Sequence, residues 1–90
     1  MTIKVDGKEY IINECTYAER RELHKLNALT WWEGKMDVDA YYAVLERVGE
    51  IAGLGEEEFK GMGMVDIDQV LIAIFHKYLG IKTAKKNSGG

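Results

Sequence analysis

Polar and apolar side chains alternate at the start of the chain, as they do in a β-strand with one buried face. Residues 2–5 alternate in this way, Asp6-Gly7 follows as a two-residue turn, and residues 9–12 form a returning, largely apolar run. An Asp-Gly pair between two such runs is a strong signal of a β-hairpin. A two-stranded hairpin is only marginally stable in water unless other elements cover it. The sequence therefore predicts an α+β fold in which a small N-terminal β-hairpin packs on helices.

After residue 15 the spacing of apolar residues changes to that of an amphipathic helix. Thr16 and Glu19 have the spacing of a capping box, in which each side chain accepts a hydrogen bond from the other residue's backbone N–H. Charged residues fill most of residues 19–25. A first helix is expected over residues 17–29, with an apolar side made of Tyr17, Ala18, Leu23, Leu26 and Leu29.

A second helix is expected further along, where apolar residues recur every three or four positions. Asp37 or Asp39 is placed to cap it, and residues 31–35 ahead of it break the helical period, which predicts a loop. Gly49 lies inside the helix at a cost of about 1 kcal/mol relative to Ala, so either the packing is close there or the helix end frays. Gly53 ends the helix. Its apolar face consists of Val38, Tyr41, Tyr42, Leu45, Val48, Ile51 and Ala52.

The last predicted helix is the most apolar one. Residues 56–60 ahead of it are expected to form one helical turn, and the Gly-Met-Gly-Met segment at 61–64 is expected to be a flexible loop. Asp66 and Gln69 repeat the capping-box spacing, and Gly80 has the position of a helix-ending glycine. The apolar side of this third main helix consists of Ile67, Val70, Leu71, Ile74, Phe75, Tyr78 and Leu79.

All of these elements fall within one segment of the chain. Residues 1–80 are expected to form a single compact α+β domain with three main helices, for which an apolar content of 47% supplies a core. Residues 81–90 are polar and small, and we expect them to be a disordered tail.

Charge and cysteine content narrow the class of protein. The formal net charge of −3 argues against nucleic acid as a partner, because phosphate contacts need a basic surface. No apolar run approaches the ~20 residues that span a bilayer, and the start of the chain lacks the pattern of a secretory signal. Cys15 has no second cysteine to pair with, which fits a reducing compartment. We therefore expect a cytoplasmic protein that binds neither nucleic acid nor a membrane.

Reactive side chains are few and far apart in the predicted elements. Cys15 and His24 are the candidates for a thiol-dependent enzyme, but a rise of about 1.5 Å per helical residue separates them by more than about 10 Å. The three consecutive glutamates at 56–58 fan around a helix and do not converge as an acid–base pair. The chain also lacks the spacings of zinc, calcium and phosphate-binding motifs. We expect no catalytic site, metal or cofactor.

Aromatic and methionine side chains point to protein binding instead. Adjacent residues on a helix or strand cannot both face one core, so either one indole of the tryptophan pair is exposed or the loop folds back; we expect an exposed indole. The two methionines separated by a glycine either adapt to apolar partners or fill the bottom of a small core. The tyrosine pair either widens a binding face or spreads across the junction between helix and hairpin. The candidate protein-binding residues are Trp31, Trp32, Tyr41, Tyr42, Met62 and Met64.

Four segments carry a resemblance to a known family. They are Ile-Lys-Val-Asp-Gly-Lys-Glu-Tyr at 3–10, Thr-Tyr-Ala-Glu-Arg-Arg-Glu-Leu at 16–23, Ala-Gly-Leu-Gly-Glu-Glu-Glu-Phe at 52–59 and Asp-Ile-Asp-Gln-Val-Leu at 66–71. In this order they resemble the small tail assembly chaperones of long-tailed bacteriophages, over residues 3–80. The resemblance implies a non-enzymatic protein of the host cytoplasm that binds the tape measure protein and tail-tube subunits, forms homo-oligomers in some members, and is absent from the mature virion. It identifies no functional residues.

Two further hypotheses accompany this resemblance. The alternative function is that of a small phage- or bacteria-encoded regulator that binds and inhibits a host protein, since such a protein is also acidic, compact and poor in reactive groups. Family members are often made in a second, longer form by translational frameshifting. The string Lys85-Lys86-Asn87 can be encoded by A-AAA-AAC, a heptamer that permits slippage by one base, and we hypothesise a slip site there.

Overall fold

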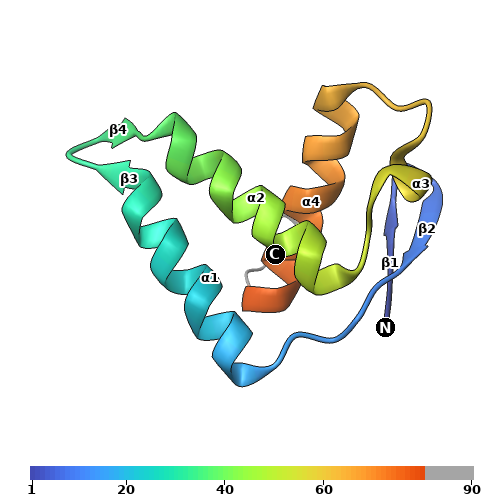
Figure 1. The fold of residues 1–90 in the computed structure, drawn as a ribbon, viewed down its shortest axis with the longest axis horizontal. Helices are drawn as coiled ribbons and strands as arrows, with labels where there is room; N and C mark the ends of the chain where they lie inside the picture. The colour runs from blue at the N-terminus through green and yellow to red at the C-terminus, as the bar shows by residue number, and fades with distance from the viewer. Residues whose placement is uncertain (81–90) are drawn as a thin grey trace, which may run out of the picture.

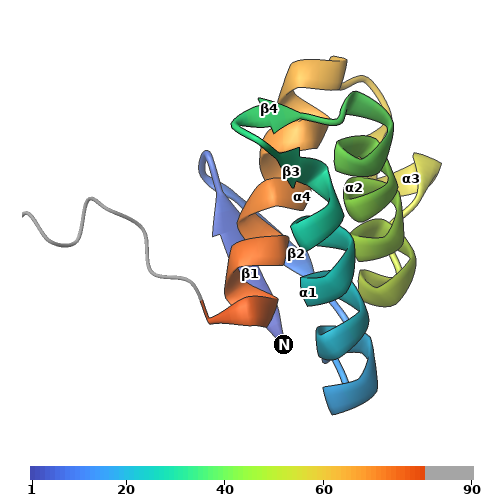
Figure 2. The ribbon, with the colours of Figure 1, turned by 90° about the vertical axis from the view of Figure 1, so that its left-hand side faces the viewer.

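A computed structural model describes residues 1–80; the predicted disordered tail at 81–90 lies outside the described residues. The elements are β1 (Thr2–Val5), β2 (Lys8–Ile11), α1 (Tyr17–Thr30), β3 (Trp31–Trp32), β4 (Lys35–Met36), α2 (Val38–Ala52), α3 (Glu56–Phe59) and α4 (Met64–Leu79). Figure 1 shows α1 and α2 joined at one edge by β3 and β4, with β1 and β2 at the opposite edge beside α3. Helices α1, α2 and α4 contact one another and lie side by side in Figure 2. The predicted α+β fold, an N-terminal hairpin packed on three main helices, is confirmed.

The N-terminal hairpin forms where the alternating pattern predicts it. Strands β1 and β2 pair antiparallel, with Val5 opposite Lys8 on either side of the two-residue turn. Asp6 and Gly7 have φ values of +51° and +82°. Two successive positive φ angles define the turn whose twist matches that of the flanking strands, and Asp-Gly is among its preferred sequences. Tyr10 is buried from β2, so one face of the hairpin covers the helices.

Helix α1 begins as predicted, but its exposed positions differ from the prediction. The Thr16 hydroxyl accepts from the Glu19 N–H at 3.1 Å, and the Glu19 carboxylate accepts from the Thr16 N–H at 3.0 Å. Leu23 is fully buried, whereas Tyr17 and Leu29 are 71% and 66% exposed. Both lie six positions from Leu23, which at 3.6 residues per turn is about 120° around the helix. Assigning Tyr17 and Leu29 to the buried side was therefore wrong.

The predicted loop between the first two helices is a second small hairpin, so that prediction was wrong. Trp31 pairs with Met36, and Trp32 pairs with Lys35, as strands β3 and β4. The turn consists of Glu33 and Gly34, with φ values of +51° and +77°. This is the same turn geometry as in the first hairpin, reached with a glutamate at a position where Asn, Asp or Gly is usual. The hairpin holds the ends of α1 and α2 together.

Helix α2 has the predicted cap and a buried glycine. The Asp37 carboxylate accepts from the Ala40 N–H at 3.0 Å, and this selects Asp37 over Asp39 as the cap. Gly49 is buried, and a Cβ built there would lie 3.5 Å from Cδ2 of Leu71 in α4. A Cβ at this distance would make ordinary van der Waals contact, so close packing against α4 does not require a glycine here. The helix ends at Gly53, which has a φ of +82°.

Helix α4 starts two residues before the predicted capping box. Its N-cap is Gly63, whose carbonyl accepts from the Ile67 N–H at 3.0 Å, and Met64 is its first residue. Asp66 therefore lies in the first turn, where its charge is favourable next to the helix dipole, and it does not cap the helix. The prediction that Met64 belongs to a flexible loop was wrong. The single turn at α3 and the ending of α4 at Gly80, with φ +76°, are confirmed.

The core lies between the three long helices and the first hairpin. Most of its side chains come from α2 and α4, and its buried apolar members are Tyr10, Ile12, Cys15, Leu23, Val44, Leu45, Val48, Ile51, Ala52, Val70, Leu71, Ile74, Phe75 and Tyr78. Helix α1 covers one side of the α2–α4 pair. The first hairpin and the single turn of α3 cover the remaining core surface only in part, and a groove stays open between α2, α3 and α4.

Candidate protein-binding surfaces

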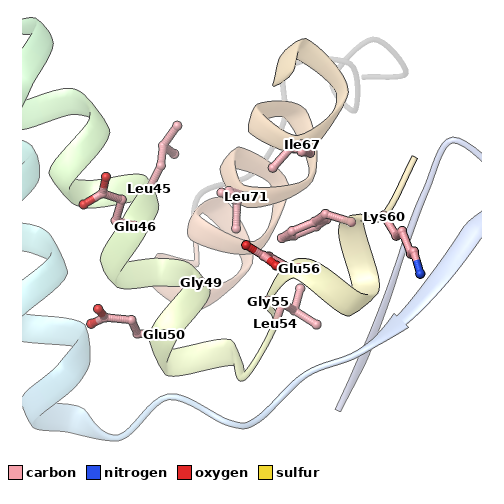
Figure 3. Close-up of a pocket in the computed structure, with 11 residues that line it drawn as sticks. Leu45, Glu46, Gly49, Glu50, Leu54, Gly55, Glu56, Lys60, Ile67 and Leu71 are labelled. Carbon is pink, nitrogen blue, oxygen red and sulfur yellow. The ribbon is translucent and has the colours of Figure 1, made fainter. Parts of the chain in front are cut away.

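A groove of about 570 Å³ opens between α2, α3 and α4. We call it the α2–α4 groove; its floor is formed by Leu45, Gly49, Leu54, Phe59, Ile67 and Leu71, and its rim carries Glu46, Glu50, Gly55, Glu56 and Lys60. Figure 3 shows side chains from α2 and α4 facing each other across it. A pocket of this size, with an apolar floor and a few charged groups at its edge, has the character of a binding site.

One position of α2 that lines the groove lacks a side chain. Gly49 places only backbone opposite Leu71, with Leu45 one turn earlier on the same side of α2. The chain then turns at Gly53, and α3 follows after Gly55, whose N–H donates to the Glu58 carboxylate at 2.7 Å. This turn sets Phe59 at the open side of the groove without closing it. An apolar surface is left uncovered.

Acidic side chains dominate the rim. Glu46 and Glu50 project from α2, and Figure 3 shows Glu56 at the start of α3 and Lys60 at the far end of the groove. Glu50 accepts from Arg47 at 3.1 Å, and the same guanidinium binds Glu22 of α1 at 2.9 Å. Within residues 1–80, Glu46 and Glu56 take part in no ion pair. The rim near α2 and α3 therefore has negative charge available for a partner.

A second apolar surface lies around the β3–β4 hairpin, where α1 is joined to α2. We call it the hairpin-tip cluster, and its exposed members are Trp31, Met36, Val38 and Tyr42. Trp31 is 55% exposed, as the sequence predicted for at least one indole of the pair. Figure 1 shows this end of the molecule projecting away from the first hairpin. Exposed indoles are common anchors of protein interfaces.

The predicted aromatic residues come together at this tip. The rings of Tyr41 and Tyr42 meet edge to face, with centroids 5.2 Å apart. Tyr41 is half-buried and lines a cavity of about 240 Å³ together with Trp31 and Phe75. The backbone of Trp32 belongs to β3, and its side chain is outside what the structure describes. Trp31, Tyr41 and Tyr42 thus share one region of the surface.

The two predicted methionines lie elsewhere and apart from that tip. Met62 is half-buried between the first hairpin and α4, and its sulfur accepts from the Tyr10 hydroxyl at 3.6 Å. Its surroundings are those of a side chain that joins two parts of the fold. Met64 is exposed in the first turn of α4. The methionine pair therefore does not form one adaptable surface.

Sequence reasoning missed the α2–α4 groove. None of its floor residues is among the six candidates: helical spacing assigned Leu45, Ile67 and Leu71 to apolar helix faces, and Gly49, Leu54 and Phe59 were given no binding role. Two signals point to it in retrospect: a glycine on the apolar face of α2, and the apolar Leu54 and Phe59 on either side of three glutamates. Neither signal fixes how α3 sits against α4, and this placement is what leaves the floor open.

The candidate thiol is buried and protonated at neutral pH. Burial raises the pKa of Cys15, the Glu19 charge acts in the same direction, and Arg20 and Arg47 oppose them. His24 is exposed on α1. A protonated, buried thiol is a weak nucleophile. In residues 1–80, no group of three or more His, Cys, Asp and Glu side chains is placed to hold a metal ion.

Comparison of the chain with protein-family models, curated proteins and solved structures gave no match. None of the helices within residues 1–80 has the length and apolar character needed to cross a membrane. Any inference about function therefore rests on the two apolar surfaces and the sequence motifs.

Proposed function

We propose that this chain is a non-enzymatic tail assembly chaperone of a long-tailed bacteriophage. In this role it binds the tape measure protein, and tail-tube subunits, in the host cytoplasm while the tail assembles, and it is left out of the mature virion. The proposal combines the motif order over residues 3–80 with the surfaces described above. A chaperone of this kind needs to cover apolar helical surface reversibly, and it needs no reactive groups of its own.

The α2–α4 groove is the observation that carries this proposal. Its floor is lined by apolar side chains, of which Ile67 and Phe59 are only half-buried, around a volume of about 570 Å³. The hairpin-tip cluster adds a second surface, so one small domain has room for two protein contacts, whether with a client and a tail-tube subunit or with a client and another copy. The net charge of −3 favours solubility of the resulting complexes.

Co-expression with the products of the adjacent genes tests the proposal. The tape measure protein is expected to aggregate when made alone, and to stay in solution and co-purify when this chain is present. Purified virions are expected to lack the chain by mass spectrometry. Recovery of a host enzyme or regulator in place of tail proteins, from a gene that lies away from tail genes, would instead favour the inhibitory regulator.

A further inference from the structure

We infer that the α2–α4 groove binds an amphipathic helix of a partner protein whose apolar stripe is flanked by Lys or Arg. This inference rests on the proposed function in one respect, because both assign the groove to a protein partner. It goes further by stating the secondary structure and charge of the segment that binds.

The walls of the groove favour a helical occupant. The walls are formed by α2, α3 and α4. The backbone N–H and C=O groups inside these helices already bond one another and offer no hydrogen bonds to a peptide. An extended peptide would find no unpaired strand edge here, whereas a helix satisfies its own backbone and needs only an apolar surface. Gly49 lowers the floor opposite Leu71, which leaves room for side chains from one face of a helix. A volume of about 570 Å³ lies within the usual range of binding pockets, roughly 300–1,000 Å³.

The charge of the rim selects a basic occupant. Glu50 is bound to Arg47, which leaves Glu46 and Glu56 as the acidic rim residues without an ion pair in the part of the chain that the structure describes. The basic rim residue Lys60 lies at the far end of the groove in Figure 3. A helix with Lys or Arg beside its apolar stripe meets Glu46 and Glu56, which have no ion-pair partner within residues 1–80. An acidic helix, or an anionic lipid surface, is repelled by the same groups.

A second copy of the chain does not fit this description. The outer face of α1 carries Arg20, Arg21 and Lys25, but its exposed apolar residues Tyr17 and Leu29 stand at opposite ends of the helix. No continuous apolar stripe runs between them to enter the floor of the groove. Helix α1 of a second copy is therefore a poor occupant, and we assign the groove to a separate protein.

Binding of designed peptides to the full chain tests the inference. The probe is a fluorescent helix of about 18 residues with Leu at positions i, i+3, i+4 and i+7 and Lys on both flanks, a length at which a helix is stable enough to populate. Its matched probes replace every Lys by Glu, or place Pro at the centre. At low salt the Lys probe is expected to bind with a Kd on the order of 10 μM, the Glu probe about tenfold more weakly, and the Pro probe not at all.

Paired variants locate the binding. Glu46→Lys with Glu56→Lys is expected to weaken the Lys probe about tenfold and to strengthen the Glu probe. The control variant, Glu14→Lys with Glu57→Lys, makes the same change in net charge at exposed residues outside the groove. Its affinity for the Lys probe is expected to stay within about twofold of the wild-type value. Urea unfolding of each variant checks that the fold is retained.

A second pair of variants tests the apolar floor. Ile67→Gln removes a floor residue, and Val65→Gln makes the same change at an exposed position of the same helix that does not line the groove. The first is expected to lower affinity several-fold and the second to leave it unchanged. Equal losses in both members of either pair would overturn the assignment to this groove.

Other outcomes also contradict the inference. They are the absence of Lys-probe binding at about 100 μM, tighter binding to anionic vesicles than to the probe, or self-association that the probe competes away. Tighter probe binding by the full-chain variant Lys82→Glu, Lys85→Glu and Lys86→Glu would assign the groove to the chain's own basic segment. If the tape measure protein co-purifies while the probe fails, only this inference falls. If the probe binds while no tail protein co-purifies, only the proposed function falls.

Discussion

Tyr78 and Asn13 are 65 residues apart in the sequence and are joined by a short hydrogen bond. The Tyr78 hydroxyl donates to the Asn13 carbonyl oxygen at 2.6 Å. Asn13 is tied to α2 as well, since its side-chain amide donates to the Ile51 carbonyl at 3.2 Å and its N–H donates to the Ala52 carbonyl at 3.0 Å. The segment between the first hairpin and α1 is thereby fixed to both helices that build the groove.

Removing the Tyr78 hydroxyl is expected to destabilise the protein. Tyr78→Phe leaves the ring in the core and deprives the Asn13 carbonyl of its donor, which lowers the free energy of unfolding by about 1 kcal/mol. Urea unfolding measures the difference. Tyr17→Phe, at an exposed tyrosine, serves as the control and should change stability by less than about 0.5 kcal/mol.

The same tyrosine gives the protein a pH dependence at high pH. Burial raises the pKa of Tyr78 from 10.0 to about 12, with smaller effects of Cys15 and Glu19 in the same direction. Above about pH 10 the unfolded chain loses this proton while the folded chain keeps it, so stability falls as the pH rises from about 10 to about 12. Urea unfolding near pH 8 and pH 11 should show the advantage of the wild type over Tyr78→Phe shrinking at the higher pH. An advantage that stays constant would argue against a buried, neutral phenol.

Two glycines in and after α2 should respond oppositely to alanine. At Gly49 the added Cβ makes ordinary contact with Leu71 at 3.5 Å, and the helix gains intrinsic stability, so Gly49→Ala should raise the free energy of unfolding by about 0.5–1 kcal/mol. At Gly53, where φ is +82°, the Cβ would lie 2.8 Å from the Asn13 side-chain nitrogen. Gly53→Ala should therefore cost about 1 kcal/mol or more. Denaturant midpoints measure the stability of both variants. A change of the same sign in the two free energies of unfolding would contradict the packing described here.

The hairpin-tip cluster is expected to matter for client binding and little for folding. Trp31→Ala removes an indole that is 55% exposed, so the circular dichroism spectrum should be preserved. The amount of co-purified tape measure protein, the proposed partner, is expected to fall about tenfold. Tyr17→Ala, also at an exposed aromatic residue but at the other end of α1, is the matched control and should retain the client. Loss of folding in Trp31→Ala would place this side chain in a structural role.

Cys15 should react slowly with thiol reagents in the folded protein. Its burial and raised pKa keep the thiol protonated, so modification at neutral pH is expected to be at least about tenfold slower than in the urea-unfolded chain. Absorbance from an aromatic disulfide reagent follows the rate. Cys15→Ala should leave client binding unchanged; loss of an enzymatic activity on this substitution would revive the thiol-dependent alternative.

The gene sequence tests the frameshifting hypothesis directly. Codons 85–87 are expected to read through A-AAA-AAC, with an open overlapping frame one base back. A heptamer broken by AAG, or a downstream frame closed by stop codons, would count against a longer form of the protein.

Elements specified by neighbouring residues were predictable from the sequence. Asp6-Gly7 fixes the first turn, and Thr16 with Glu19 fixes the start of α1, because both signals act over a few residues. The second hairpin was not predicted, since its turn places Glu33 at a positive φ that glutamate rarely adopts. The start of α4 was misplaced because Gly63 caps it without a side chain.

The candidate surfaces were only partly predictable. An exposed tryptophan was expected from two adjacent indoles, because neighbouring residues of a regular element face different sides. The α2–α4 groove depends on how α3 packs beside α4, and on which face of α2 is turned toward Leu71. Such relationships between elements distant in sequence leave no local pattern, and the groove was therefore found only in the assembled fold.

Long-range bonding of the first hairpin has a consequence for the order of folding. The hairpin is bonded to the rest of the fold from Lys8 to the Glu58 carbonyl and from Tyr10 to Met62, across 50 and 52 residues. Helices α1 and α2, in contrast, are joined directly by the short hairpin β3–β4. Closing a long loop costs more chain entropy than closing a short one, so the α1–α2 pair assembles early and the hairpin docks last. By the same reasoning we expect residues 1–12 to detach first during native-state fluctuations, and their amide protons to exchange with solvent ahead of those in α2 and α4.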